Sequence, residues 1–124
     1  MPLRGMNHAA LRVKDVKRAY MFYHDTLELP IDRIIGSQSS PRIVFLQGVE
    51  LSQARPDQGP AGFSHLGLVV ERIEEVYEEL RKKGIVFEGP VRDVRFEDEK
   101  KAVKVAFFSD PDGNRVELVE WRDL

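Results

Sequence analysis

Two histidines occupy the same place in two similar stretches of the sequence. His8 is the second residue of segment 7–16, and His65 is the second residue of segment 64–73, 57 positions further on. In both segments the histidine opens an alternating apolar run, and a helix-patterned stretch follows. A repeat of this kind indicates two copies of one structural module, each carrying one histidine at the same position.

Two glutamates also recur at matching positions, near the end of each copy. The triplet Val-Glu-Leu at 49–51 aligns with the same triplet at 116–118, which makes Glu50 and Glu117 equivalent. Equivalent positions of two repeated modules can meet around a pseudo-twofold axis. Two imidazoles and two carboxylates suit a divalent ion such as Zn²⁺, Ni²⁺, Mn²⁺ or Fe²⁺. Such an ion also explains carboxylates among apolar neighbours, because an unpaired buried charge is unfavourable.

Each of these residues alone has a simpler interpretation. A single histidine at the start of a strand is more often structural than metal-binding, and a single strand glutamate usually faces solvent. Recurrence in both halves favours the metal site. The position of Glu50 depends on strand register, because Gln53 lies nearby and a shift of one residue would reverse the two faces. His24 has no counterpart in the repeat and is expected near a helix end, outside the site.

The first module, about residues 6–54, is predicted to fold as β-α-β-β-β. Residues 1–6 are a lead-in, and Asp15 is an N-cap candidate for a helix from about Val16 to Thr26. Strands are expected at 8–13, 31–35, 42–47 and 49–53. A linker rich in proline and glycine follows at 55–62.

The second module, residues 63–122, repeats this order. Its helix is expected at 73–83, and its strands at 65–70, at 85–87 with 91–96, at 103–108 and at 115–121. A charged turn is predicted at 97–101. The segment Asp-Pro-Asp-Gly-Asn at 110–114 predicts a second turn, between the last two strands.

Length and composition set the class of protein. A chain of 124 residues has the typical length of one domain, so 1–124 is expected to be a single domain whose two halves share a core. A net charge of −2 gives no basic surface for nucleic acid. The absence of cysteine excludes disulfides and thiolate chemistry. Neither a membrane span nor a signal peptide is visible, so a cytoplasmic protein is expected.

Three parts of the sequence resemble the vicinal oxygen chelate superfamily. They are residues 7–13 with 19–23, residues 63–68, and the characteristic segment Phe-Phe-Ser-Asp-Pro-Asp-Gly-Asn-Arg-Val-Glu-Leu-Val-Glu at 107–120. The superfamily includes glyoxalase I (lactoylglutathione lyase), methylmalonyl-CoA epimerase, extradiol dioxygenases, and fosfomycin and bleomycin resistance proteins. The resemblance implies an α+β fold in which two βαβββ modules form a cup-shaped mixed sheet around a metal ion.

Carried over residue by residue, the resemblance implies the metal ligands His8, Glu50, His65 and Glu117. Glyoxalase I-like members use two histidines and two glutamates, so the ligand pattern is closest to theirs. Glu117 or Glu50 would then act as general base and acid on a substrate held through neighbouring oxygens. Epimerases typically have glutamine at the position of Glu50, and no residue of the short 31–42 loop is identifiable as a glutathione contact.

Three functions stay open at this stage. The first is a metal-dependent lyase or isomerase that abstracts a proton next to a carbonyl. The second is an Fe(II) dioxygenase of the extradiol type, using His8, His65 and Glu117 as a facial triad. The third is a binding or resistance protein without chemistry, which the intact ligand set disfavours. The partner is expected to be a small-molecule substrate, and the resemblance implies a homodimer.

Overall fold

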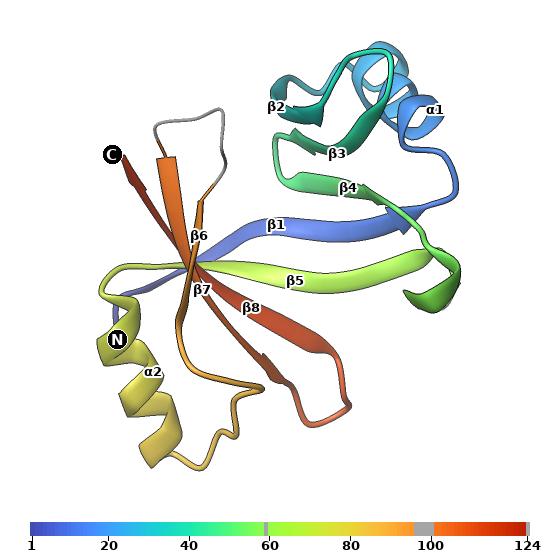
Figure 1. The fold of residues 1–124 in the computed structure, drawn as a ribbon. Helices are drawn as coiled ribbons and strands as arrows, with labels where there is room; N and C mark the ends of the chain where they lie inside the picture. The colour runs from blue at the N-terminus through green and yellow to red at the C-terminus, as the bar shows by residue number, and fades with distance from the viewer. Residues whose placement is uncertain (59, 96–100, 124) are drawn as a thin grey trace. The chain divides into compact units, whose positions relative to one another are not determined.

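The computed structural model describes residues 1–58, 60–95 and 101–123, which follow the βαβββ order twice (Figure 1). The first module contains β1 (Leu3–Val13), α1 (Val16–Met21), a π-helical turn (Phe22–Thr26), β2 (Ile31–Gly36), β3 (Pro41–Leu46) and β4 (Val49–Gln53). A short 3₁₀ turn (Pro56–Gln58) follows. The second module contains β5 (Gly62–Val70), α2 (Ile73–Lys82), β6 (Arg92–Arg95), β7 (Lys101–Ser109) and β8 (Arg115–Asp123). The predicted α+β class with two βαβββ modules is confirmed.

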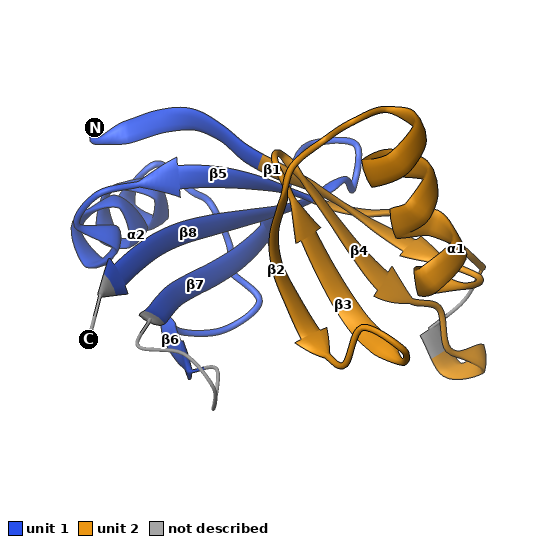
Figure 2. Ribbon diagram, turned by 90° about the horizontal axis from the view of Figure 1, so that it is seen from above, with its two compact units in different colours: residues 1–7, 66–124 blue, residues 8–65 orange. Residues whose placement is uncertain are grey.

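The chain divides into two compact units (Figure 2). Unit 2 is His8–His65, and unit 1 is Met1–Asn7 together with Leu66–Leu124. Unit 2 has the strand order β2-β3-β4-β1, in which only β4 and β1 are parallel neighbours. Unit 1 has the order β5-β8-β7-β6, in which only β5 and β8 are parallel. Each unit therefore places the first and last strands of one module side by side.

In unit 2 the face of the sheet under α1 forms the core. Leu51 on β4 is fully buried and packs in one cluster with Val16 of α1. Leu11 on β1 is the register partner of Leu51 and packs against the same cluster. Successive side chains of a strand point to opposite faces. The paired residues Ala10 and Glu50, one position earlier on each strand, therefore lie on the face away from α1.

Unit 1 repeats this arrangement. Leu118 on β8 is fully buried in the cluster that contains Ile73 of α2. Its neighbours Glu117 and Val119 point to the other face, where Val119 packs with Val105. Glu50 and Glu117 thus each lie on the sheet face opposite the helix of their own unit.

The start of β1 differs from the prediction. The strand begins at Leu3, so the expected lead-in at residues 1–6 is wrong from position 3 onwards. The extension is held by the Glu71 backbone N–H, which donates to the Pro2 carbonyl (3.0 Å), and by an ion pair of Arg4 with Glu71 (3.2 Å). Both contacts join residues nearly seventy positions apart, which the local alternation of apolar residues does not reveal.

The predicted helix at 16–26 is present, but its last turn is wider than an α-helix. Asp15 caps the start, its carboxylate accepting from the Arg18 backbone N–H (3.2 Å). At the end, the Leu27 N–H donates to the Phe22 carbonyl five residues back (3.1 Å). His24 Nδ1 lies 2.8 Å from the Leu29 carbonyl oxygen, which anchors the wider turn. His24 therefore lies at the helix end, as predicted.

None of the described helices is long and apolar enough to cross a membrane.

The predicted turn at 110–114 is confirmed. The Asp110 carboxylate accepts hydrogen bonds from the backbone N–H groups of Asp112 (2.9 Å) and Asn114 (2.8 Å). Bonding to the Asn114 side chain and backbone holds the pKa of Asp110 below its usual range. Gly113 takes a φ of +86°, which favours glycine. The turn sets the start of β8 and so the position of Glu117. Of the other predicted turn, at 97–101, residues 97–100 lie outside the described residues.

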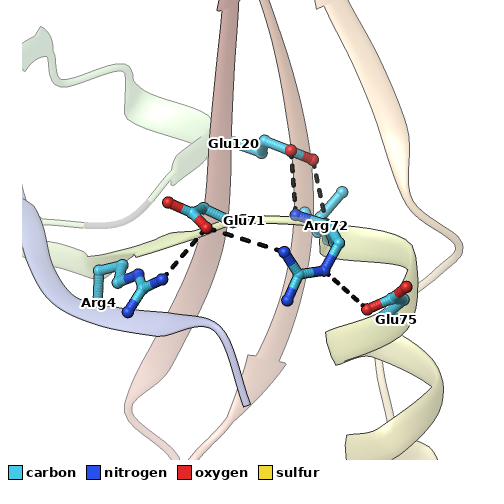
Figure 3. Close-up of polar contacts among 6 residues, drawn as sticks. Arg4, Glu71, Arg72, Glu75 and Glu120 are labelled. Carbon is cyan, nitrogen blue, oxygen red and sulfur yellow. Dashed lines mark hydrogen bonds and ion pairs between the residues drawn. The ribbon is translucent and has the colours of Figure 1, made fainter.

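One side chain from the last strand of each module binds the start of that module's helix. In unit 1, the Glu120 carboxylate accepts from the backbone N–H groups of Arg72 (3.1 Å) and Ile73 (3.2 Å), as Figure 3 shows. Arg72 has a φ of +52° and no cap from its own side chain. In unit 2, the Gln53 amide oxygen accepts from the Val16 N–H (3.2 Å). These bonds satisfy N–H groups that a helix start leaves open.

The two capping residues also show on which face of the sheet each candidate carboxylate lies. Gln53 follows Glu50 by three positions, and Glu120 follows Glu117 by three. Residues an odd number apart on a strand point to opposite faces. Because Gln53 and Glu120 reach the helix, Glu50 and Glu117 must point away from it. This settles the strand register of Glu50.

Replacing Glu120 by alanine is expected to lower the free energy of unfolding by about 1–2 kcal/mol, because the cap and its charge at the helix start are lost. Glu120→Gln keeps an acceptor oxygen and should lose less. Urea unfolding followed by circular dichroism measures both. Glu79→Ala, an exposed position of α2, is the control. Equal stability of Glu120→Ala and the control would contradict the capping role.

Candidate metal centre

Three of the four predicted ligands come together within unit 2. His8, Glu50 and His65 each offer one ligand atom, and these atoms all lie within 4.8 Å of one another. The Nε2 atoms of the two histidines are 3.3 Å apart. The Glu50 Oε2 atom is 3.8 Å from Nε2 of His65. The three residues come from β1, β4 and β5, far apart in the sequence.

The group is shielded from solvent. His8 and His65 are the two buried polar residues among those described, each 9% exposed, and the Glu50 side chain is 19% exposed. The imidazole rings meet edge to face, with centroids 5.3 Å apart and planes at 86°. Their Nε2 atoms therefore face one another rather than solvent. Buried polar groups in this position need hydrogen-bonding or metal partners.

The separations match those of ligands around one ion. Zn–N bonds of about 2.0–2.1 Å at tetrahedral angles put neighbouring ligand atoms about 3.3–3.4 Å apart. The histidine nitrogens have that spacing, and the Glu50 oxygen lies slightly further away. Imidazole nitrogen and carboxylate oxygen are donors that Zn²⁺, Ni²⁺, Mn²⁺ and Fe²⁺ accept. The residues present thus fit a divalent metal.

Glu117, the fourth predicted ligand, belongs to unit 1. It lies in the middle of β8, where its Cα partners are Gly67 on β5 and Phe107 on β7. Its role as a ligand or base therefore belongs to the proposal below.

Two further polar residues lie near members of the group of three in the chain, one directly before His65 and one on the strand of His8. The Ser64 hydroxyl is 3.0 Å from Nδ1 of His65, and sequence reasoning did not single it out. The only signal was a hydroxyl residue directly before the histidine. Arg12 lies on the same face of β1 as His8, four residues on, and is paired in register with Ser52. Its buried Nε atom has no hydrogen-bond partner among the described residues.

Comparison with known proteins matches most of the sequence to one family. Residues 5–118 match the model of the Glyoxalase/Bleomycin resistance protein/Dioxygenase superfamily. The chain is 29% identical over 136 residues to lactoylglutathione lyase of Salmonella typhimurium, covering 94% of this chain and 92% of that protein. It is 26% identical over 146 residues to lactoylglutathione lyase of Schizosaccharomyces pombe, covering 92% of this chain. The chain spans about half, 46%, of that second relative.

Among solved structures, methylmalonyl-CoA epimerase from Mycobacterium tuberculosis has the same fold. The TM-score is 0.72, with 96% of this chain and 89% of the epimerase covered, at 18% sequence identity. The family match extends over both βαβββ modules and includes His8, Glu50, His65 and Glu117. The chain therefore belongs to the Glyoxalase/Bleomycin resistance protein/Dioxygenase superfamily.

Proposed function

We propose that this chain is a metal-dependent lyase or isomerase, similar to glyoxalase I, that moves a proton between neighbouring carbons of a small substrate. The observation that carries the proposal is the buried group of His8, Glu50 and His65, whose ligand atoms lie within 4.8 Å of one another. Family membership and the two lactoylglutathione lyase relatives support it. The proposal includes a cytoplasmic homodimer, which rests on composition and resemblance.

In this proposal His8, Glu50, His65 and Glu117 hold a divalent ion, Ni²⁺, Zn²⁺, Mn²⁺ or Fe²⁺. When bound, the ion supplies a Lewis acid that polarises a substrate carbonyl and stabilises an enediolate. The histidines bind as neutral imidazoles through Nε2, the atoms that already face one another. Burial of the group keeps water away from the charges that develop during the reaction.

The proton transfer is assigned to a carboxylate. Glu117 or Glu50 takes a proton from the carbon next to the carbonyl and returns it to the neighbouring carbon, acting first as base and then as acid. One proton is removed and one is returned, so substrate and product are isomers and no oxidant is needed. Both glutamates lie on the face of their sheet opposite the helix, which leaves their carboxylates clear of the helix-side core.

The substrate is proposed to be an acidic molecule with a thioester or hemithioacetal. The relatives are named for lactoylglutathione and methylmalonyl-CoA, and both of these carry carboxylate or phosphate groups. Arg12 supports an anionic substrate, because its guanidinium shares the site's face and its Nε is unpaired within the described part of the chain. The loop between β2 and β3 is only four residues, 37–40, and its sequence identifies no residue as a glutathione contact.

A second candidate is an Fe(II) oxygenase. Two histidines and one carboxylate are the donor set of the facial triad in such enzymes, and His8, Glu50 and His65 are such a set. This version uses Glu50 as the carboxylate, whereas the sequence suggested Glu117. Oxygen consumption with iron-loaded protein and a catechol separates this candidate from the isomerase.

The test of the proposed function is an isomerase assay on protein loaded separately with Ni²⁺, Zn²⁺ or Mn²⁺. The hemithioacetal of methylglyoxal and glutathione is followed by thioester absorbance, and methylmalonyl-CoA by exchange of its α-proton with deuterium. We expect metal-dependent turnover of at least one substrate, abolished by chelator and restored by the ion. Metal binding without turnover or exchange would leave a binding protein and contradict the isomerase.

A further inference from the structure

The two ring nitrogens of His65 have different partners. Nε2 faces His8 Nε2 (3.3 Å) and Glu50 Oε2 (3.8 Å), the other members of the candidate metal group. Nδ1 lies 3.0 Å from the Ser64 hydroxyl oxygen. The Ser64 side chain is partly buried, so water competes only in part for this bond. The geometry thus separates a metal-facing side of the ring from a side held by Ser64.

A neutral imidazole carries a single N–H, and its position decides which of the two ring nitrogens can bind a metal. Binding through Nε2 requires a lone pair there, which puts the hydrogen on Nδ1. The Ser64 oxygen is placed to accept that N–H. A hydroxyl has two acceptor lone pairs and can still donate its own hydrogen elsewhere. Outer hydrogen bonds of this kind orient a metal-binding histidine and set its tautomer.

We propose that Ser64 is a positioning residue for the metal centre. It accepts the Nδ1–H of His65, and so holds the ring in the tautomer and rotation that present the Nε2 lone pair to the ion. The inference rests on the proposed function, since it assigns Ser64 a part in the same site. Ser64 touches neither the ion nor the substrate and acts through His65 alone.

His24 provides an internal reference for this tautomer. Its Nδ1 lies 2.8 Å from the Leu29 backbone carbonyl oxygen. A carbonyl can only accept, so the hydrogen of a neutral His24 is on Nδ1. In the metal-free protein, ¹⁵N-detected NMR of the imidazoles should give His65 the same Nδ1–H pattern as His24. The Ser64→Ala variant should shift His65 toward a mixture of both tautomers, with His24 unchanged.

Metal affinity is the second readout. Competition of the protein with a chromophoric chelator for Zn²⁺ alone should show binding weakened about 10–100-fold in Ser64→Ala. Ser64→Thr retains the hydroxyl and should stay within about threefold of the wild type. Ser109→Ala removes a hydroxyl at the exposed end of β7 and serves as the matched control. Urea unfolding of each variant checks that the fold is intact.

The outcomes separate this inference from the proposed function. In one outcome the wild type and Ser64→Ala bind Zn²⁺ equally, with the His65 tautomer unchanged. That result would overturn only the role of Ser64 and would leave the metal site standing. No Zn²⁺ binding by the wild type would overturn the metal site and this inference with it. Loss of affinity in the alanine variant, rescued by threonine and accompanied by the tautomer shift, would establish Ser64 as the positioning residue.

Discussion

Glu117→Gln will reduce turnover by about 10²–10⁴-fold, the contribution of a general acid–base group. Glutamine has nearly the shape of glutamate but cannot accept a proton at neutral pH. Position 117 lies in the middle of β8, paired with Gly67 and Phe107, so the backbone should hold the glutamine amide where the carboxylate was. The loss should therefore appear in kcat more than in KM. Steady-state kinetics on metal-loaded protein, with the metal content of each sample measured, gives this result.

Glu120→Gln is the matched control for Glu117→Gln. It makes the same chemical change three residues further along β8, on the opposite face, where the side chain caps α2. Activity should be retained in this control. Glu50→Gln tests the other candidate base, since loss of turnover in metal-loaded Glu50→Gln while Glu117→Gln stays active would assign the proton transfer to Glu50. Full activity of metal-loaded Glu117→Gln would remove Glu117 from the mechanism.

His65→Ala is expected to weaken Zn²⁺ binding by about 10³-fold, which is about 4 kcal/mol at 1.4 kcal/mol per tenfold. His65 lies within 4 Å of both other members of the group, 3.3 Å from His8 and 3.8 Å from Glu50. Its removal leaves only two of the three ligands in unit 2. Calorimetry or chelator competition measures the change.

The third histidine of the chain provides the control for this prediction. His24 lies at the end of the first helix, with Nδ1 directed at the Leu29 carbonyl, and is not in the metal group. His24→Ala should leave Zn²⁺ affinity unchanged, although it removes an anchor of the helix end. Equal loss of affinity in both variants would indicate that the measured binding is not at the centre described.

The features that were predictable from sequence are those that depend on short-range pattern. Alternation of apolar residues predicted the strands that carry His8 and Glu50, and the structure contains both as β1 and β4. The order of strands and helices in each module follows from changes in the spacing of apolar residues along the sequence. The turn at 110–114 follows from its residue types. The equivalence of Glu50 and Glu117 follows from the repeated triplet and agrees with the face that each occupies in its own unit.

The features that were missed depend on contacts between distant residues. The first residues of β1 are held by Glu71. Gln53 and Glu120 add hydrogen bonds at the helix starts, 37 and 47 residues from the N–H groups of Val16 and Ile73. No local periodicity encodes these bonds. Ser64 adjoins His65 in sequence, but only the ring orientation in the folded chain brings its hydroxyl within hydrogen-bond distance of Nδ1 of His65.

The most direct test is the metal content of protein purified without chelator, with Glu50→Ala measured in parallel. A centre built on His8, Glu50 and His65 predicts about one Ni²⁺, Zn²⁺, Mn²⁺ or Fe²⁺ per wild-type chain and a sharp reduction in the variant. Iron with oxygen consumption would select the oxygenase over the isomerase while keeping the centre. A wild-type chain that holds no ion, even after reconstitution with each of the four, would contradict the metal centre itself.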